Sequence, residues 1–93
     1  MDLNLKDRVA IITGPAKGMG AAVSRQFAAE GCRLVLIGRD TAAIEPVADE
    51  VRSKGGEAVI GACDITDSDA CEQAAALARE SFGGRIDILV NIA

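Results

Sequence analysis

The fold is decided by the stretch Val9-Ala10-Ile11-Ile12-Thr13-Gly14-Pro15-Ala16-Lys17-Gly18-Met19-Gly20. Its first four residues are apolar, which is typical of a strand covered on both faces. Glycines follow at positions 14, 18 and 20, and apolar side chains then recur near helical spacing from Met19 to Glu30. Gly31 stands where a helix C-terminal cap is expected. The stretch therefore predicts a strand, a glycine-rich turn and a helix.

The rest of the chain repeats this alternation. We predict further strands at Leu34–Ile37, Ala58–Ala62 and Ile86–Ile92, and a helix at Asp69–Ser81. Ile44, Val47 and Val51 mark another helix that ends before Gly55-Gly56. Pro46 fits a first turn better than a helix interior, so the start of that helix stays open.

The resulting order, β-α-β-α-β-α-β, predicts an α/β fold with right-handed crossovers. We expect a Rossmann-type, doubly wound parallel sheet in the strand order 3-2-1-4, with helices on both faces in a three-layer αβα arrangement. In such sheets, ligands bind at the carboxyl ends of the strands where the strand order reverses. The glycine turn and the segment Asn91–Ala93 both fall at that edge.

Each glycine of the turn has a separate physical reason. Gly14 takes the tight turn out of the strand, Gly18 leaves space for a pyrophosphate beside the backbone, and Gly20 lets the helix pack closely on the sheet. The free N–H groups at the helix start would face the anion. The alternative is a plain glycine-rich turn between a strand and a helix.

Composition limits the other functions. The 93 residues suffice for one small domain, and only 2% of them are aromatic, so Val, Ile, Leu and Ala must build the core. A net charge of −4 gives no reason to expect a nucleic-acid or membrane partner. We see no targeting segment or membrane helix. The cysteines at 32, 63 and 71 follow no metal-ligand spacing, which favours reduced thiols in a cytoplasmic protein.

The pattern T-G-x-x-x-G-x-G at Thr13–Gly20 resembles the short-chain dehydrogenase/reductase family. Asp64-Ile65, after the third strand, resembles the family's adenine pocket, and Leu89-Val90-Asn91-Ile92-Ala93 resembles its N-N-A-G motif. The chain departs from the family at Pro15, which offers no N–H, and at Ile92, which replaces an asparagine. The resemblance implies an oxidoreductase that transfers hydride between NADP(H) and an alcohol or carbonyl group of a small molecule, and a homo-oligomer.

The cofactor-binding residues expected from this pattern lie at the carboxyl ends of the strands. They are Gly14, Lys17, Gly18, Met19, Gly20, Arg39, Asp64, Ile65, Asn91 and Ala93. Asp64 has a competing role, because it could instead cap the turn before the third helix, as could Thr66, Asp67 and Ser68.

The end of the second strand indicates the cofactor. An acidic residue about 20 positions beyond the glycine loop would bind the ribose of NAD, but Gly38 and then Arg39 stand there. Glycine leaves room for a 2′-phosphate, and Arg39 and Lys17 would bind it, so we expect NADP rather than NAD. One alternative is that Arg39 is a solvated charge and Asp40 caps the next helix. Another is that Asp40 draws Arg39 away in a local ion pair.

The sequence contains no tyrosine and no histidine. The resemblance implies a catalytic tyrosine, lysine, serine and asparagine elsewhere, and no catalytic residue is assigned within 1–93. An apolar fourth strand would form an edge, so we expect residues 1–93 to be the truncated N-terminal part of a single domain. The alternative function is a non-catalytic nucleotide-binding module. A methyltransferase is disfavoured because Gly38-Arg39 replaces the acid that such enzymes usually need.

Overall fold

The computed structural model describes residues 5–63, 68–83 and 86–92. Strands and helices alternate along these ranges, as the sequence predicts. The strands are β1 (Val9–Thr13), β2 (Arg33–Gly38), β3 (Glu57–Ala62) and β4 (Ile88–Asn91). The helices are α1 (Gly18–Ala29), α2 (Thr41–Ser53) and α3 (Ser68–Ser81).

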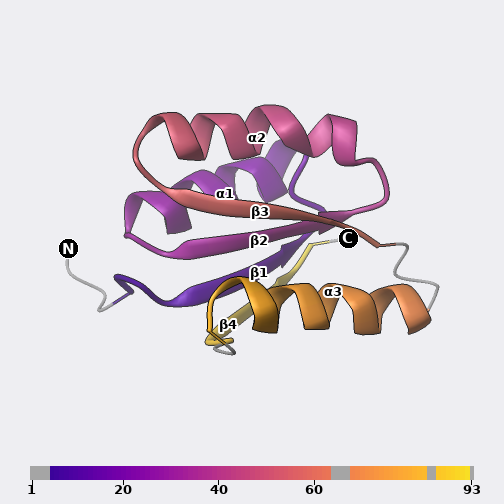
Figure 1. Ribbon diagram of the computed structural model, residues 1–93. Coiled ribbons are helices and arrows are strands. Elements are labelled where there is room, and N and C mark those ends of the chain that lie inside the picture. The colour runs from indigo at the N-terminus through magenta and orange to yellow at the C-terminus, as the bar shows by residue number, and fades with distance from the viewer. Residues whose placement is uncertain (1–4, 64–67, 84–85, 93) are drawn as a thin grey trace.

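The strands form one parallel sheet in the order β3-β2-β1-β4. Helices α1 and α2 cover one face and α3 covers the other (Figure 1). Ile11 in β1 is in register with Val35 in β2 and with Leu89 in β4. The predicted Rossmann-type, three-layer fold with strand order 3-2-1-4 is therefore confirmed, and β1 occupies the position where the strand order reverses.

Side chains of the central strands alternate between two apolar clusters, because successive residues of a strand point to opposite faces. Ala10 and Ile12 of β1 join Leu34 and Leu36 of β2 in the larger cluster, which α1 and α2 cover. The cluster on the other face contains Val9, Ile11, Val35, Ile37, Cys63 and Ala78. Both faces of β1 and β2 are thus dry, as their continuous apolar runs predict.

Glycines end the first two helices. Gly31 has φ +88°, and the N–H groups of Gly31 and Cys32 donate to the carbonyls of Ala28 and Phe27. Gly55, with φ +86°, closes α2 in the same way. These are Schellman caps, which turn the chain sharply back into the next strand.

The structure defines the start of α2, which the sequence left open, and corrects the bounds of the fourth strand. Helix α2 starts at Thr41 behind the cap residue Asp40, so Pro46 lies inside the helix and not in its first turn. Four buried residues hold the helix in place despite the missing proline N–H: Ile44, Val47, Ala48 and Val51. Strand β4 is shorter than predicted and covers Ile88–Asn91. None of the helices in the described ranges has the length and hydropathy for crossing a membrane.

Candidate cofactor site

The glycine loop leaves the sheet at the carboxyl end of β1. The N–H of Gly14 donates to the carbonyl of Ile37 at 3.2 Å, which extends the contact between β1 and β2 by one residue. Gly14 then turns with φ +66°, a conformation that residues with a Cβ adopt at a cost. The loop is therefore fixed to the sheet at its first residue.

Gly20 holds the start of α1 against this turn. A Cβ at position 20 would overlap the carbonyl oxygen of Gly14 and lie 3.0 Å from the Cα of Pro15. The buried hydroxyl of Ser24 donates to the carbonyl of Gly20 at 2.8 Å, one helical turn away. Only glycine fits at position 20, as its role in close helix packing requires.

The start of α1 is open for an anion. No side chain caps it, its N-cap residue Lys17 is extended, and its first turn contains no acidic residue. A Cβ at Gly18, where φ is +54°, would meet no atom within 4 Å. The start of α2 differs, because the Asp40 carboxylate accepts a hydrogen bond from the N–H of Ala43. The uncapped N–H groups of α1 and the space at Gly18 suit a pyrophosphate.

Thr13 and Asn91 join β1 to β4 beside the loop. The Thr13 hydroxyl donates to Asn91 Oδ1 at 2.8 Å and accepts from the N–H of Ile92 at 3.3 Å. Ile92 therefore supplies its main chain at the position where the family motif has an asparagine. Sequence reasoning assigned no role to Thr13, although the residue stands directly before the first glycine of the motif.

Two cations flank the loop. Lys17 and Arg39 are exposed, and neither side chain has an ion pair or hydrogen bond with another of the described residues. Asp40 caps α2, as one alternative predicts, but the ion pair between Asp40 and Arg39 that would have withdrawn the guanidinium is not formed. Both cations are thus available to an anionic ligand.

The reason for a glycine at position 38 differs from the one that the sequence suggested. A Cβ at this position would lie 3.0 Å from Cδ1 of Ile44 and 3.9 Å from Cδ of Pro15. Glycine at position 38 therefore permits close packing of α2, where the sequence predicted room for a phosphate. Pro15 is fully buried beside it, so this proline is a core residue of the loop as well as a position without an N–H.

The model of the family described as short chain dehydrogenase matches residues 8–93. The chain belongs to the short-chain dehydrogenase/reductase family. It is 39% identical over 92 residues to D-threitol dehydrogenase from Mycolicibacterium smegmatis, matching 99% of this chain and 35% of that protein. The first curated relatives have similar coverage, from 28% to 32% of their length, so the chain spans about a third of the relatives it matches.

Solved structures of the family have the same fold. L-sorbose reductase from Gluconobacter frateurii, complexed with NADPH and L-sorbose, superposes with a TM-score of 0.93 at 35% identity, over 100% of this chain and 35% of that chain. A short-chain dehydrogenase/reductase from Burkholderia phymatum in complex with NAD gives 0.87 at 30% identity, over 91% and 30%. Both nicotinamide cofactors thus occur among these structural neighbours.

Of the other residues expected to bind the cofactor, one lies beside the loop and three lie outside the described residues. Met19 is 72% exposed on the first turn of α1, next to the loop. Asp64, Ile65 and Ala93 lie outside the residues that the structure describes, so their expected roles stay predictions. Within the described ranges, no group of three His, Cys, Asp or Glu side chains is placed to hold a metal ion.

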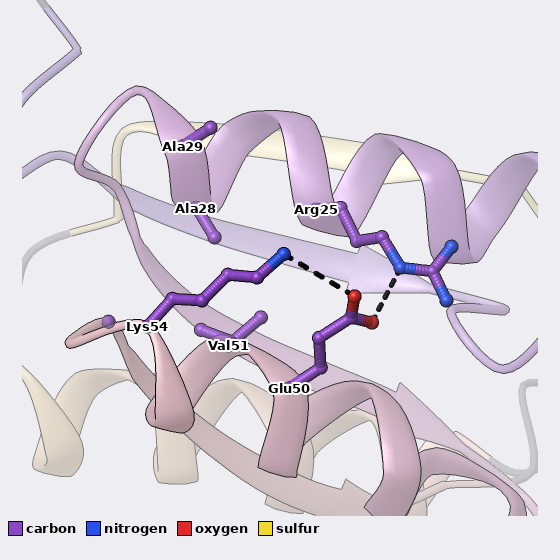
Figure 2. Close-up of a pocket in the computed structure, with 7 residues that line it drawn as sticks. Arg25, Ala28, Ala29, Glu50, Val51 and Lys54 are labelled. Atoms are coloured by element: carbon purple, nitrogen blue, oxygen red, sulfur yellow. Dashed lines mark hydrogen bonds and ion pairs between the residues drawn. The ribbon is translucent and has the colours of Figure 1, made fainter.

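Two hollows on the surface lie away from the glycine loop. One lies between α1 and α2, where Arg25 and Lys54 both point toward Glu50 (Figure 2). The Arg25 hydrogen bond to Glu50, 2.6 Å long, is the main cause of a lowered pKa for that carboxyl. A second hollow contains Lys6, Cys32 and Arg33 at the amino ends of the strands. Burial there raises the pKa of the Cys32 thiol. Neither hollow is lined by residues of the glycine loop.

Proposed function

We propose that this chain binds NADP through the glycine loop, as the nucleotide-binding part of an oxidoreductase that acts on an alcohol or carbonyl substrate. The observation that carries the proposal is the uncapped start of α1 beside open space at Gly18. Helix N–H groups without a capping side chain stabilise an anion such as a pyrophosphate. When bound, the cofactor would supply or accept the hydride.

Cations next to this site favour NADP. A 2′-phosphate carries nearly two negative charges at neutral pH, and Arg39 can offer it two parallel N–H donors. Lys17 contributes a second positive charge on a flexible stem. Both side chains are exposed and have no partner in the described part of the chain, so binding the phosphate breaks no ion pair.

The remaining contacts belong to the same proposal. Gly14, Gly18 and Gly20 shape the loop, and Met19 would cover the cofactor from the first turn of α1. Asn91 uses its Oδ1 to accept from Thr13, which leaves its NH2 group for a ligand. Asp64, Ile65 and Ala93 are proposed contacts on the family resemblance alone.

Titration of NADPH and NADH against the purified chain tests the cofactor assignment. The chain contains no tryptophan or tyrosine, so cofactor fluorescence can be followed without protein background. We expect NADPH to bind at least about tenfold tighter than NADH. Arg39→Ala should remove most of that preference and leave NADH binding nearly unchanged, whereas the control Arg25→Ala, in the groove of Figure 2, should change neither affinity. Equal binding of both cofactors by the wild type would contradict the proposal.

Catalysis is proposed for the whole protein and not for these residues. The chain contains no tyrosine or histidine that could transfer the proton. We therefore expect the 93-residue chain to bind NADPH without consuming it in the presence of alcohols or ketones. Turnover above that of a mock purification would show that the chemistry has been assigned wrongly. A longer protein containing this chain that binds NADPH but reduces no carbonyl compound would favour the non-catalytic module.

We also propose a cytoplasmic location, a small-molecule substrate and a homo-oligomeric whole protein. The location is supported by Cys32, which is a buried free thiol. Unpaired thiols of this kind are usual in reducing compartments. The substrate class and the oligomer rest on membership of the family.

A further inference from the structure

Position 38 lies where a side chain would distinguish NAD from NADP. In doubly wound folds that bind NAD, an acidic residue at the end of the second strand binds the ribose hydroxyls. Gly38 is the last residue of β2 and is half-buried. It points to the face that α1 and α2 cover, because Leu34 and Leu36, at alternate positions of β2, belong to the larger cluster. A side chain here would therefore begin between the glycine loop and α2.

Ile44 of α2 already occupies this space. A Cβ at position 38 would lie 3.0 Å from Cδ1 of Ile44, 3.9 Å from its Cγ1 and 3.9 Å from Cδ of Pro15, and these are the three nearest atoms. Carbon atoms pack best at about 3.5–4.0 Å, so the two longer distances are ordinary contacts and the shortest is not. The terminal methyl group of Ile44 is thus the group that most directly opposes a side chain at position 38.

Neither side of this contact can withdraw freely. Ile44 is 1% exposed within the larger cluster, so its methyl group cannot rotate into solvent. Helix α2 begins only three residues after Gly38, behind its cap residue Asp40. The carbonyl of Gly38 accepts from the N–H of Cys63 at 3.0 Å, which holds this end of β2 to the chain that follows β3. A carboxylate at position 38 would therefore be forced against an apolar group that has no room to move.

We propose that Ile44 is a specificity-determining residue, because its δ-methyl group excludes an acidic side chain from position 38. Without a carboxylate there, position 38 does not repel a 2′-phosphate, and the exposed Arg39 can attract it. The inference rests on the proposed binding of NADP and deepens it, since it assigns part of the preference to a buried side chain of α2.

Urea denaturation tests the packing without any cofactor. Ile44→Val removes Cδ1 alone and leaves a γ carbon at an ordinary distance from the new Cβ. We expect Ile44→Val to lower the urea midpoint of the wild type, as the loss of a buried methyl group does, and to lower that of Gly38→Ala less. Ile12→Val is the matched control. It removes the same methyl group from a fully buried residue of the same cluster, and its effect should be equal in both backgrounds.

Fluorescence titrations of NADPH and NADH then test specificity. The ratio of NADPH affinity to NADH affinity should be at least about tenfold lower in Gly38→Asp/Ile44→Val than in the wild type, because the carboxylate now fits, binds the ribose hydroxyls and repels the 2′-phosphate. Gly38→Asp alone, or combined with Ile12→Val, should change this ratio less or fail to fold, since the δ-methyl group remains.

Three results would overturn the role of Ile44 in a wild type that binds NADPH, and each leaves the proposed function standing. The first is a shift of the ratio in Gly38→Asp as large as in the double variant. The second is a folded double variant with the wild-type ratio. The third is an equal effect of Ile44→Val on the urea midpoint of the wild type and of Gly38→Ala, which decides the matter if no aspartate variant folds. A wild type that binds neither cofactor would instead remove the proposed function, and this inference with it.

Discussion

The hydroxyl of Thr13 lies 2.8 Å from Oδ1 of Asn91 and connects the carboxyl ends of β1 and β4, two strands that are 78 residues apart at this point. The same hydroxyl accepts from the N–H of Ile92 at 3.3 Å. The loop that begins at Gly14 and the segment that follows β4 are therefore held at a fixed separation, and the proposed cofactor would lie against both.

Replacing Thr13 with valine should remove every hydrogen bond of the hydroxyl, including a 3.4 Å contact with the carbonyl oxygen of Val90, with little change in volume. We expect the free energy of unfolding to fall by about 1 kcal/mol, the typical contribution of an intramolecular hydrogen bond. Denaturation in urea measures this change. Thr41→Val is the matched control, because the Thr41 hydroxyl makes no hydrogen bond with a described residue, and it should stay within about 0.5 kcal/mol of the wild type. An equal loss of stability in both variants would show that the Thr13 hydroxyl does not connect β1 to β4.

Gly20→Ala should destabilise the chain although it lies in a helix. Glycine to alanine in a helix normally raises stability by about 0.5–1 kcal/mol. Here the new methyl group would overlap the carbonyl of Gly14, so we expect a loss of about 1–3 kcal/mol, as for an overpacked core. Ala22→Gly at an exposed position of α1 calibrates the helix propensity in the same urea experiment. A stabilised Gly20→Ala variant would mean that the loop moves freely.

Gly18→Ala should affect binding more than folding. The added Cβ meets no atom within 4 Å, so only the positive φ opposes it, at a cost of about 1 kcal/mol. Gly55→Ala is a close control, with φ +86° and equally open space at the end of α2. Both variants should lose similar stability, and only Gly18→Ala should bind NADPH at least about tenfold more weakly. If NADPH binding is equal in the two variants, the pyrophosphate does not lie at Gly18.

The sequence predicts those features that depend on neighbours along the chain. Apolar runs such as Val9–Ile12 identify the strands, and glycines such as Gly31 identify helix ends, because burial and positive φ restrict residue type locally. The strand order 3-2-1-4 is expected from the doubly wound class of fold, because right-handed crossovers alone permit other orders. Pro46 left the start of α2 open, because the sequence does not show that four buried side chains outweigh one lost hydrogen bond.

Contacts between distant elements could not be predicted in this way. The bond between Thr13 and Asn91 depends on the register of β4 against β1, which no local pattern reveals. Arg52 binds a carbonyl of Ala58, and a backbone acceptor carries no residue identity. The packing of Ile44 against Gly38 likewise follows from how α2 lies on the sheet.

The ion pair between Arg25 and Glu50, shown in Figure 2, makes the stability of the folded chain depend on pH. The hydrogen bond from Arg25 lowers the pKa of Glu50, so the charged carboxylate is favoured in the folded state. Its contribution to stability is present above the ordinary glutamate pKa of about 4.3 and is lost as the pH falls through the lower folded pKa. An NMR titration of the Glu50 side chain should show its pKa rising toward the ordinary value in Arg25→Met. An unchanged pKa in that variant would assign the shift to another group.

Reversal of charge at Arg39 gives the sharpest test of cofactor choice. A hydrogen bond to a charged group contributes roughly 1.5–3 kcal/mol, and each 1.4 kcal/mol corresponds to about a tenfold change in affinity. Arg39→Asp replaces this attraction with repulsion of the 2′-phosphate and offers a carboxylate to the ribose hydroxyls of NAD, so the preference should reverse.

Lys17→Met should lower the preference less, because a flexible ammonium is more strongly hydrated than a guanidinium. The contribution of Lys17 should also decline more steeply with salt, since its charge is exposed and screened. Fluorescence titrations of both cofactors at low and physiological salt measure these effects on the two variants. If Arg39→Asp weakens NADH as much as NADPH, the guanidinium acts on the loop as a whole. A 2′-phosphate would then lie elsewhere, and the preference for NADP would have to come from residues other than Arg39.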